Sequence, residues 1–316
     1  MSLRIITNES QTFYGHGKLL ITGEYFVLDG AKALAVPTTY GQSLRIKELQ
    51  AASSMLYWVA LNHQKKAWLN LVFNTKDFSC MNSGQPEAQR LSKILSETRR
   101  LSPKFLNTNQ DYAIETQLEF PNEWGLGSSS TLIHCVARWA NVNGYELLKN
   151  TIGGSGYDLA AAGIDSAILY ERKGNLAQTE AINWEPSFKE QLYFVYTGKK
   201  QLSSQAIEYY KNQLKDKEPA IRKLNLITDS VLKANSLKDF EALIEEHEKI
   251  ISTHLHLKKV KEIMFADYWG SVKSLGAWGG DFVLMTNGRG KEELKNYLSD
   301  RKIDTCFSWD ELIYKK

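Results

Sequence analysis

The chain has little cysteine and no large excess of charge of either sign. Its 316 residues include only three cysteines, Cys80, Cys135 and Cys306, which are far apart and form neither a disulfide framework nor a CxxC metal pair. The formal net charge is +3, and Lys and Arg are scattered, whereas nucleic-acid-binding proteins usually concentrate them. We therefore expect a cytoplasmic protein without a nucleic-acid partner.

The sequence also lacks any long hydrophobic run. No stretch approaches the roughly 18 apolar residues of a membrane helix, and the first ten residues lack the apolar core of a signal peptide. The hydrophobic content of 43% and the charged content of 24% are ordinary for a globular protein. A chain of this length predicts one large or two medium domains and no membrane partner.

Hydrophobic periodicity predicts an α+β protein. The change from strand-rich to helix-rich sequence near residue 185 predicts two domains, 1–185 and 186–316. The predicted strands are 18–21, 25–28, 55–61 with 68–73 as a hairpin, 111–120, 192–196, 281–286 and 305–309. The predicted helices are 87–100, one from Ser128 to Gly144, 203–215, 218–234, 237–256, 258–275 and 291–298.

Two glycines separate a predicted strand from a predicted helix. Gly125 and Gly127 precede the hydroxyl residues 128–130. Glycine permits positive φ and close approach to a ligand. The first N–H groups of a helix are unpaired and attract anions, so a polyphosphate fits this loop, and the hydroxyls of Ser128 and Ser129 could reach a phosphate or its Mg²⁺. No lysine follows as in GxxxxGK[ST], and a plain serine-capped helix is the alternative interpretation.

An acidic residue and a lysine complete the candidate chemistry. Asp158 follows a second glycine-rich loop, 153–156, and alone it is a favourable helix-start residue. Phosphoryl transfer needs a group that orients the attacking oxygen and can take its proton. It also needs cations near the transferring group, and Lys18 suits that role. Taken alone, Lys18 is more simply a surface lysine at a strand start.

Together, these segments resemble the motifs of the GHMP kinase superfamily. Residues 17–28 look like its first motif, 121–130 like its PxxxGLGSS phosphate loop, and 273–281 like its third, glycine-rich motif. The order is the expected one, and the resemblance covers essentially the whole chain. Residues 154–162 and 196–204 are most similar to the phosphomevalonate and mevalonate kinase branch, as is the aspartate at position 281.

The resemblance implies a fold, co-substrates and site residues. It implies an N-terminal domain like domain 2 of ribosomal protein S5, a ferredoxin-like C-terminal domain, ATP with Mg²⁺, and a small acceptor of the mevalonate pathway. Asp158 would be the catalytic carboxylate and Lys18 its partner. Nucleotide contacts are expected from Asn122, Gly125, Leu126, Gly127, Ser128, Ser129 and Ser130, with Ser128 and Ser129 near the metal. Acceptor contacts are expected from Glu24, Tyr25, Ser155, Gly156, Lys199, Ser203, Ser204, Gly276, Ala277 and Gly279.

The sequence departs from the family pattern at several places, which leaves alternatives open. His16 replaces a proline, Trp124 precedes the phosphate loop, and Trp278 stands where the third motif has glycine. Glu146 is the only acidic residue between Gly144 and Asp158, and it is not assigned as a metal ligand. Phosphomevalonate is slightly favoured over mevalonate as acceptor. The alternatives are a sugar or homoserine acceptor, a decarboxylase, and a nucleotide-binding protein without catalysis; a homodimer is also open.

Histidines and charges in the predicted helix 237–256 are not assigned a function. His247, His254 and His256 are spaced by seven and two residues, which differs from the HExxH pattern of helical zinc sites. The charged run 241–249 is typical of a helix with i, i+4 ion pairs. We expect both features to lie on a solvated helix face or at its end.

Overall fold

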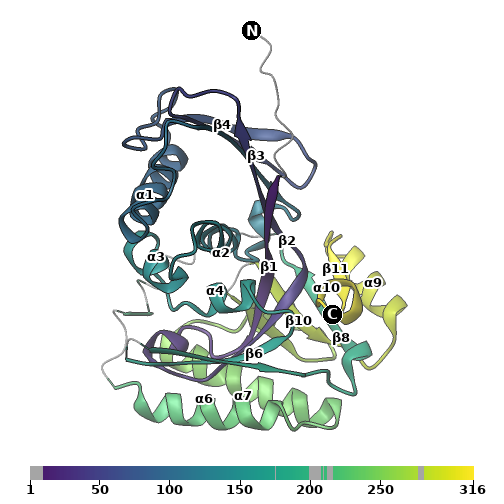
Figure 1. Cartoon of the computed structure of the whole chain (residues 1–316). Helices are drawn as coiled ribbons and strands as arrows, with labels where there is room; N and C mark the ends of the chain where they lie inside the picture. The colour runs from purple at the N-terminus through teal and green to yellow at the C-terminus, as the bar shows by residue number, and fades with distance from the viewer. Residues whose placement is uncertain (1–9, 175, 199–207, 209, 212–215, 277–280) are drawn as a thin grey trace. The chain divides into compact units, whose positions relative to one another are not determined.

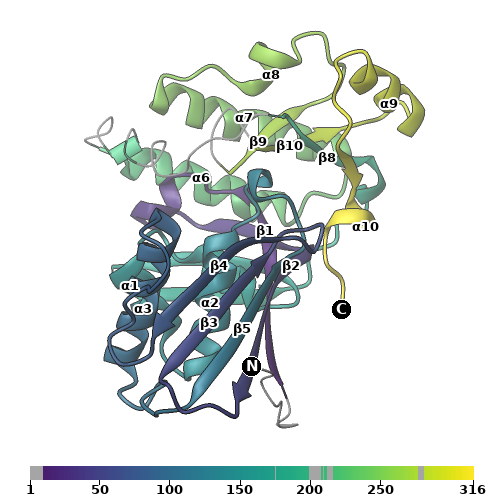
Figure 2. The ribbon, with the colours of Figure 1, turned by 90° about the horizontal axis from the view of Figure 1, so that it is seen from above.

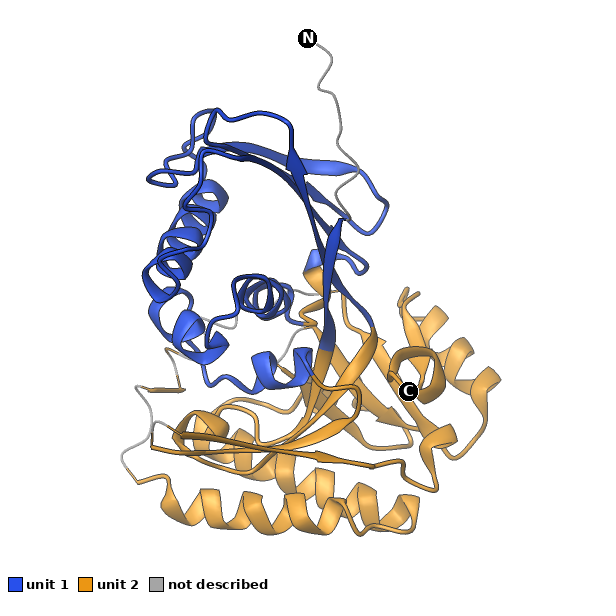
Figure 3. Ribbon diagram, in the orientation of Figure 1, with its two compact units in different colours: residues 1–17, 40–122, 127–163 blue, residues 18–39, 123–126, 164–316 orange. Residues whose placement is uncertain are grey.

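The computed structural model describes residues 10–174, 176–198, 208, 210, 211, 216–276 and 281–316. The chain forms two compact units, shown in Figure 3: unit 1 contains residues 1–17, 40–122 and 127–163, and unit 2 contains residues 18–39, 123–126 and 164–316. These units do not follow the predicted boundary between residues 185 and 186. The predicted site residues Lys199, Ser203, Ser204, Ala277 and Gly279 lie outside the described residues, as do Trp278 and most of the predicted helix 203–215.

Within the described ranges, seven strands form the larger sheet. They are β1 (Gln11–Thr22), β2 (Ala33–Leu49), β3 (Met55–Leu61), β4 (Ala67–Asn74), β5 (Asp111–Leu118), β6 (Ala167–Lys173) and β7 (Leu176–Ile182). The order is β4-β3-β5-β2-β6-β7, and β1 pairs with β2. Strands β3 and β5 are parallel, and β3 with β4 forms the predicted antiparallel hairpin. The long strand β2 pairs with β5 in unit 1 and with β6 in unit 2.

In unit 1, helices cover one face of the sheet (Figure 2). They are α1 (Pro86–Leu101), α2 (Ser128–Ala140), α3 (Gly144–Thr151) and the short α4 (Tyr157–Ala162). Alternation along β3 buries Leu56, Trp58 and Ala60, while α1 buries a stripe at helical spacing that includes Leu91 and Leu95. The two-residue spacing of buried side chains in β3 is that of a strand, and the spacing in α1 is that of a helix. This core therefore follows directly from the sequence pattern.

Helix α2 ends earlier than predicted. Asn141 adopts a left-handed conformation with φ of 53° and ends the helix, while Gly144 is the first residue of α3. The Asn143 side chain accepts hydrogen bonds from the N–H groups of Tyr145 and Glu146 and so caps α3. The prediction that Gly144 ends the helix was therefore wrong, because asparagine both tolerates the left-handed conformation and caps helices.

In the described part of unit 2, four strands form a second sheet. They are β8 (Leu192–Tyr196), β9 (Val272–Leu275), β10 (Phe282–Thr286) and β11 (Cys306–Ser308). The helices are α6 (Glu218–Val231) and α7 (Leu237–Leu255), which lie side by side (Figure 1), with α8 (Val260–Met264), α9 (Lys291–Ser299) and α10 (Trp309–Leu312). The sheet order is β11-β8-β10-β9, and its paired strands are antiparallel. This order, with helices after β8 and β10, is the ferredoxin-like topology that was predicted.

Two predicted elements of unit 2 are wrong. Residues 25–28 were expected as a strand, but Phe26–Asp29 form a 3₁₀ helix, η1, entered through Gly23 and Tyr25 at positive φ. Residues 258–275 were expected as a helix, but they hold the short α8 and then the buried strand β9. Short apolar runs suit a buried strand as well as a helix, so periodicity alone does not separate the two.

No helix in the described ranges is long and apolar enough to cross a lipid bilayer.

Candidate active site

The glycine loop between β5 and α2 has the backbone that its sequence predicts. The short 3₁₀ helix η2 (Asn122–Trp124) leads to Gly125 and Gly127, whose φ angles are 68° and 93°. Gly127 is the N-cap of α2, and its carbonyl oxygen accepts hydrogen bonds from the N–H groups of Ser130 and Thr131. A glycine therefore occupies the cap position for which serine was suggested. The Ser128 hydroxyl donates instead to Asn122 Oδ1 at 3.1 Å.

Lys18 is hydrogen-bonded to this loop through both its backbone and its side chain. Its N–H donates to the Leu126 carbonyl oxygen at 3.0 Å, and its Nζ donates to the Gly125 carbonyl oxygen at 3.1 Å. The side chain is 6% exposed. All three residues belong to unit 2. The predicted lysine and the start of the predicted phosphate loop are thus brought together.

The first turn of α2 is packed closely against β1 within unit 1. A Cβ atom at Gly15 would lie 3.3 Å from Thr131 Cα, so glycine allows this close approach. The Thr131 hydroxyl lies 2.7 Å from Gln42 Oε1 on β2 and 2.9 Å from the Ser128 carbonyl oxygen. These contacts fix the helix end that carries Ser128 and Ser129.

Asp158 lies in the first turn of α4, which packs against α2 in unit 1. Gly153, Gly154 and Gly156 all have positive φ, and Gly156 is the N-cap of α4. Ser155 is buried, while Asp158 is half-buried. An acidic residue is favoured at a helix N-terminus. Unit 1 therefore carries both the start of α2 and the predicted catalytic carboxylate.

The third glycine-rich segment reaches the same loop through a residue that was not among the predicted site residues. The carboxylate of Asp281 lies directly against Gly125, in the place that a Cβ atom of residue 125 would occupy. Gly276, a predicted acceptor contact, has φ of 80°. Sequence reasoning noted Asp281 only as a branch feature; its position after the third motif was the available signal.

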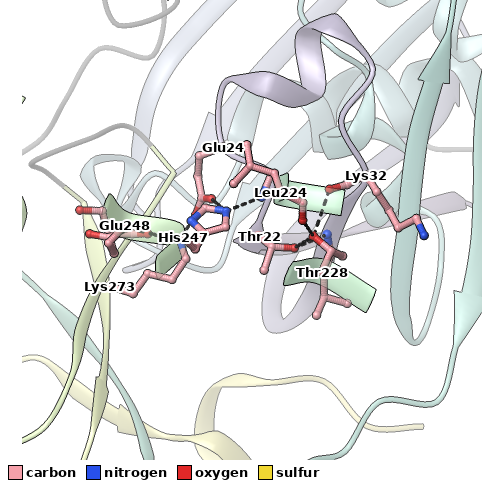
Figure 4. A network of polar contacts seen from close by, with 11 residues as sticks. Thr22, Glu24, Lys32, Leu224, Thr228, His247, Glu248 and Lys273 are labelled. Atoms are coloured by element: carbon pink, nitrogen blue, oxygen red, sulfur yellow. Dashed lines mark hydrogen bonds and ion pairs between the residues drawn. The ribbon is translucent and has the colours of Figure 1, made fainter. Parts of the chain in front are cut away.

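Glu24 lies in a buried polar cluster. This Lys273 cluster consists of Glu24, His247, Glu248 and Lys273, each at most 2% exposed (Figure 4). Lys273 Nζ donates to Glu24 Oε1 and lies 3.7 Å from Glu248 Oε1. The Gly23 N–H donates to His247 Nε2 at 3.0 Å. The expectation that His247 and the charged run 241–249 lie on a solvated face is wrong for His247 and Glu248.

Burial sets the protonation states within the Lys273 cluster. Desolvation raises the pKa of Glu248 to about 8, although Lys273 opposes the rise, and desolvation also raises the pKa of Glu24. The pKa of His247 is lowered well below its usual value by burial and then by the charge of Lys273. Because His247 Nε2 accepts a hydrogen bond, the ring is neutral, with its hydrogen on Nδ1. With a pKa of about 8, Glu248 is mainly protonated at neutral pH, while Lys273 Nζ donates its hydrogen bond to Glu24.

Tyr25, the neighbouring predicted acceptor contact, has a buried side chain. Its ring centroid lies 5.8 Å from that of Tyr210, whose hydroxyl donates to Asp29 Oδ2 at 2.6 Å. Tyr25 is 7% exposed and has φ of 61°. Its described contacts are thus with the core of unit 2.

Within the described ranges, no group of three or more His, Cys, Asp and Glu side chains is arranged to hold a metal ion.

Comparison with solved structures places the whole chain in a known fold. The mevalonate kinase of Methanococcus jannaschii is 19% identical and matches with a TM-score of 0.68 over 98% of this chain and 100% of that chain. The galactokinase of Lactococcus lactis, solved with galactose, is 13% identical and matches with a TM-score of 0.72 over 98% and 94%. The phosphomevalonate kinase of Streptococcus pneumoniae, solved with phosphomevalonate and AMPPNP, is 16% identical and matches with a TM-score of 0.69 over 94% and 99%.

No family model and no curated protein sequence matches the chain. The structural matches nevertheless show that it has the α+β, two-sheet fold of the GHMP kinases over nearly its whole length. Structures of the mevalonate branch are among those it resembles.

Proposed function

We propose that this protein is an ATP-dependent kinase that transfers the γ-phosphoryl group to a small acceptor of the mevalonate pathway. The observation that carries the proposal is the double attachment of Lys18 to the glycine loop, through its N–H and its Nζ, in a chain with the GHMP kinase fold. A lysine held at such a loop suits the binding of a phosphate that approaches the same backbone.

The residues around the glycine loop fit a nucleotide. Gly125 and Gly127 have positive φ and no side chain, and the N–H groups of Ser128 and Ser129 precede the first hydrogen bonds to the Gly127 carbonyl oxygen, which Ser130 and Thr131 make. The positive end of the α2 dipole favours the phosphates, and Lys18 adds a full charge. The Ser128 and Ser129 hydroxyls would hold Mg²⁺ together with phosphate oxygens, as this ion prefers few protein ligands. Bound there, Mg²⁺ would offset the negative charge of the phosphates.

We assign to Asp158 the task of orienting the acceptor. Its carboxylate would accept a hydrogen bond from the attacking hydroxyl and take its proton, or align the acceptor if a phosphate oxygen attacks. The position in the first turn of α4 stabilises the ionised carboxylate. Ser155 and Gly156 lie next to it in sequence and would contact the acceptor.

Phosphomevalonate is our preferred acceptor, and mevalonate is second. A doubly charged acceptor needs additional cationic and hydroxyl contacts, for which Lys199, Ser203 and Ser204 are the proposed residues, and Gly276, Ala277 and Gly279 are further proposed acceptor contacts. Glu24 and Tyr25 are also proposed acceptor contacts; their described contacts, with Lys273 and Tyr210, lie within unit 2.

An ADP-release assay with purified protein tests the proposal. Phosphomevalonate, mevalonate, galactose and homoserine are compared at equal concentration with MgATP, and turnover is expected with the first or second. Asp158→Asn should lower kcat by about 10²–10⁴ while ATP still binds. The matched control is Asp165→Asn, an exposed aspartate just after α4, which should retain activity.

Three results would contradict parts of the proposal. Absence of turnover with both mevalonate compounds would end the pathway assignment. Full activity of Asp158→Asn would refute the role of that residue. ATP binding without turnover of any acceptor would favour a nucleotide-binding protein without catalysis.

A further inference from the structure

Trp124, the unusual residue before the glycine loop, packs into an aromatic cluster of unit 2. Its ring centroid lies 5.3 Å from that of Phe307, 5.6 Å from that of Phe282 and 6.5 Å from that of Tyr196. The first two pairs are edge-to-face, a favoured geometry for aromatic rings. These partners come from β8, β10 and β11, so the indole joins the loop to the four-stranded sheet.

Gly125, the next residue, is enclosed by two charged side chains. Lys18 Nζ donates to its carbonyl oxygen, and the carboxylate of Asp281 occupies the space beside its Cα. A Cβ atom at residue 125 would overlap Oδ2 and Cγ of Asp281. The φ of 68° is a second reason for glycine here, since L-residues rarely adopt this conformation.

The backbone of Asp281 is itself held in an uncommon conformation. Its φ is 55°, which costs about 1 kcal/mol or more for a residue other than glycine. Its carbonyl oxygen accepts hydrogen bonds from the N–H of Thr197 at 2.9 Å and from the Thr197 hydroxyl at 3.1 Å. Thr197 directly follows β8 and Asp281 directly precedes β10, so the sheet fixes the direction in which the carboxylate points.

We infer that Trp124 and Asp281 are positioning residues, which hold the glycine loop in the conformation that presents its N–H groups. Trp124 fixes the entry to the loop, and Asp281 fills the space beside the Cα of Gly125. This explains why a tryptophan is accepted at position 124: its ring packs against the sheet of unit 2. The structural part of the inference is independent of ligand, and its consequence for phosphate binding rests on the proposed function.

Hydrogen exchange of the nucleotide-free protein tests the structural part. The amides of residues 125–131 are compared in wild type, Trp124→Ala and Asp281→Gly, the glycine variant being chosen because it removes the carboxylate without straining the positive φ. We expect at least a ten-fold faster exchange in both variants while peptides of α1 and β3 keep their protection. The conservative variants Trp124→Phe and Asp281→Asn should keep most of the wild-type protection of these loop amides. Trp68→Ala, at a 55% exposed tryptophan, and Asp165→Gly are the controls.

A double substitution tests the contact between Gly125 and Asp281 directly. Gly125→Ala should speed exchange of the loop amides, and addition of Asp281→Gly should speed it little further, because both substitutions disrupt the same contact. Unchanged exchange in Trp124→Ala and Asp281→Gly, or fully additive effects in the double variant, would overturn the inference.

Steady-state kinetics tests the consequence for the proposed function. Trp124→Ala and Asp281→Gly should raise KM for MgATP about ten-fold and change kcat less. If the wild type binds no ATP while the exchange results hold, the positioning role stands and the proposed function fails. If ATP turns over but both variants exchange and bind like wild type, the positioning role fails alone.

Discussion

Two buried lysines of unit 2, Lys18 and Lys273, differ in the groups to which they donate hydrogen bonds. Lys18 is 6% exposed and donates to a carbonyl oxygen of a glycine loop whose backbone has positive φ. Lys273 is fully buried and donates to the Glu24 carboxylate and to the Ser274 carbonyl oxygen at 2.9 Å. A lysine on a glycine loop can serve an arriving anion, whereas a buried ion pair already satisfies its own charges. The comparison predicts opposite outcomes for matched substitutions.

The largest effect is expected from Lys273→Met. The substitution leaves two buried carboxyl groups without their described cation, and removal of one member of a buried pair typically costs about 3–5 kcal/mol. Urea denaturation measures the free energy of unfolding. The control is Lys295→Met, which removes an exposed ion pair with Glu292 and should cost less than about 1 kcal/mol. Equal values for the two variants would show that the cluster is not structural.

Lys18→Met should affect catalysis more than stability. We expect kcat/KM for MgATP to fall by about 10²–10³, because a preorganised charge at the transferring phosphate is lost. The free energy of unfolding should fall by about 1.5–3 kcal/mol, the value of a hydrogen bond made by a charged group. Parallel kinetics and urea denaturation measure both. A stability loss as large as that of Lys273→Met would erase the distinction between the two lysines.

Glu248 should make stability dependent on pH. Its pKa in the folded protein, about 8, lies above its usual value of 4.5, so its stabilising contribution is complete below about pH 4.5 and is lost as pH rises to about 8. Since one pKa unit corresponds to about 1.4 kcal/mol, a rise of this size means that Glu248→Gln should gain roughly 4 kcal/mol relative to wild type between pH 5 and pH 8.5. Urea denaturation across this range measures it.

The control for this titration is Glu246→Gln, at an exposed position of α7, which should follow the wild-type pH profile. A Glu248→Gln profile parallel to that of wild type would mean that Glu248 does not titrate in this range.

The smallest effect is expected from Thr228→Val, beside the Lys273 cluster in Figure 4. The buried Thr228 hydroxyl lies 2.9 Å from Thr22 Oγ1 and 3.0 Å from the Leu224 carbonyl oxygen. Loss of these uncharged contacts should cost about 1–2 kcal/mol. Ser230→Ala, one half-turn further along α6 and exposed, is the control. A loss of unfolding free energy larger than that of Lys273→Met would show that these uncharged hydrogen bonds stabilise the fold more than the Lys273 cluster does.

Much of the fold could be predicted because its signals are local. The hairpin of β3 and β4, the stripe of α1 and the glycines around α2 and α4 each follow from the spacing of a few neighbouring residues. The errors arose where a short segment suits two conformations. Residues 25–28 form a 3₁₀ helix because Gly23 and Tyr25 turn the chain, and residues 272–275 form a strand because β10 pairs with them.

The candidate site was predicted unevenly for the same reason. The glycine loop, Lys18 and the helix start at Asp158 are local patterns, and the structure gives the loop the positive φ angles that its glycines allow. The place of Asp281 against Gly125 was not predicted, because it depends on how the backbone after the third motif is held by Thr197. The place of Glu24 in the Lys273 cluster was also not predicted, because its partner Lys273 is 249 residues away in the sequence.

The sequence by itself determined the hairpin of β3 and β4, the glycine positions and the chemical types of the candidate site residues, because these depend on near neighbours along the chain. Only the tertiary structure decided which charged groups are buried and which oxygen each lysine contacts. Burial and pairing depend on segments that are remote in sequence: His247 and Glu248 resemble residues of a solvated helix until contacts with Gly23 and with Lys273 of β9 remove them from water.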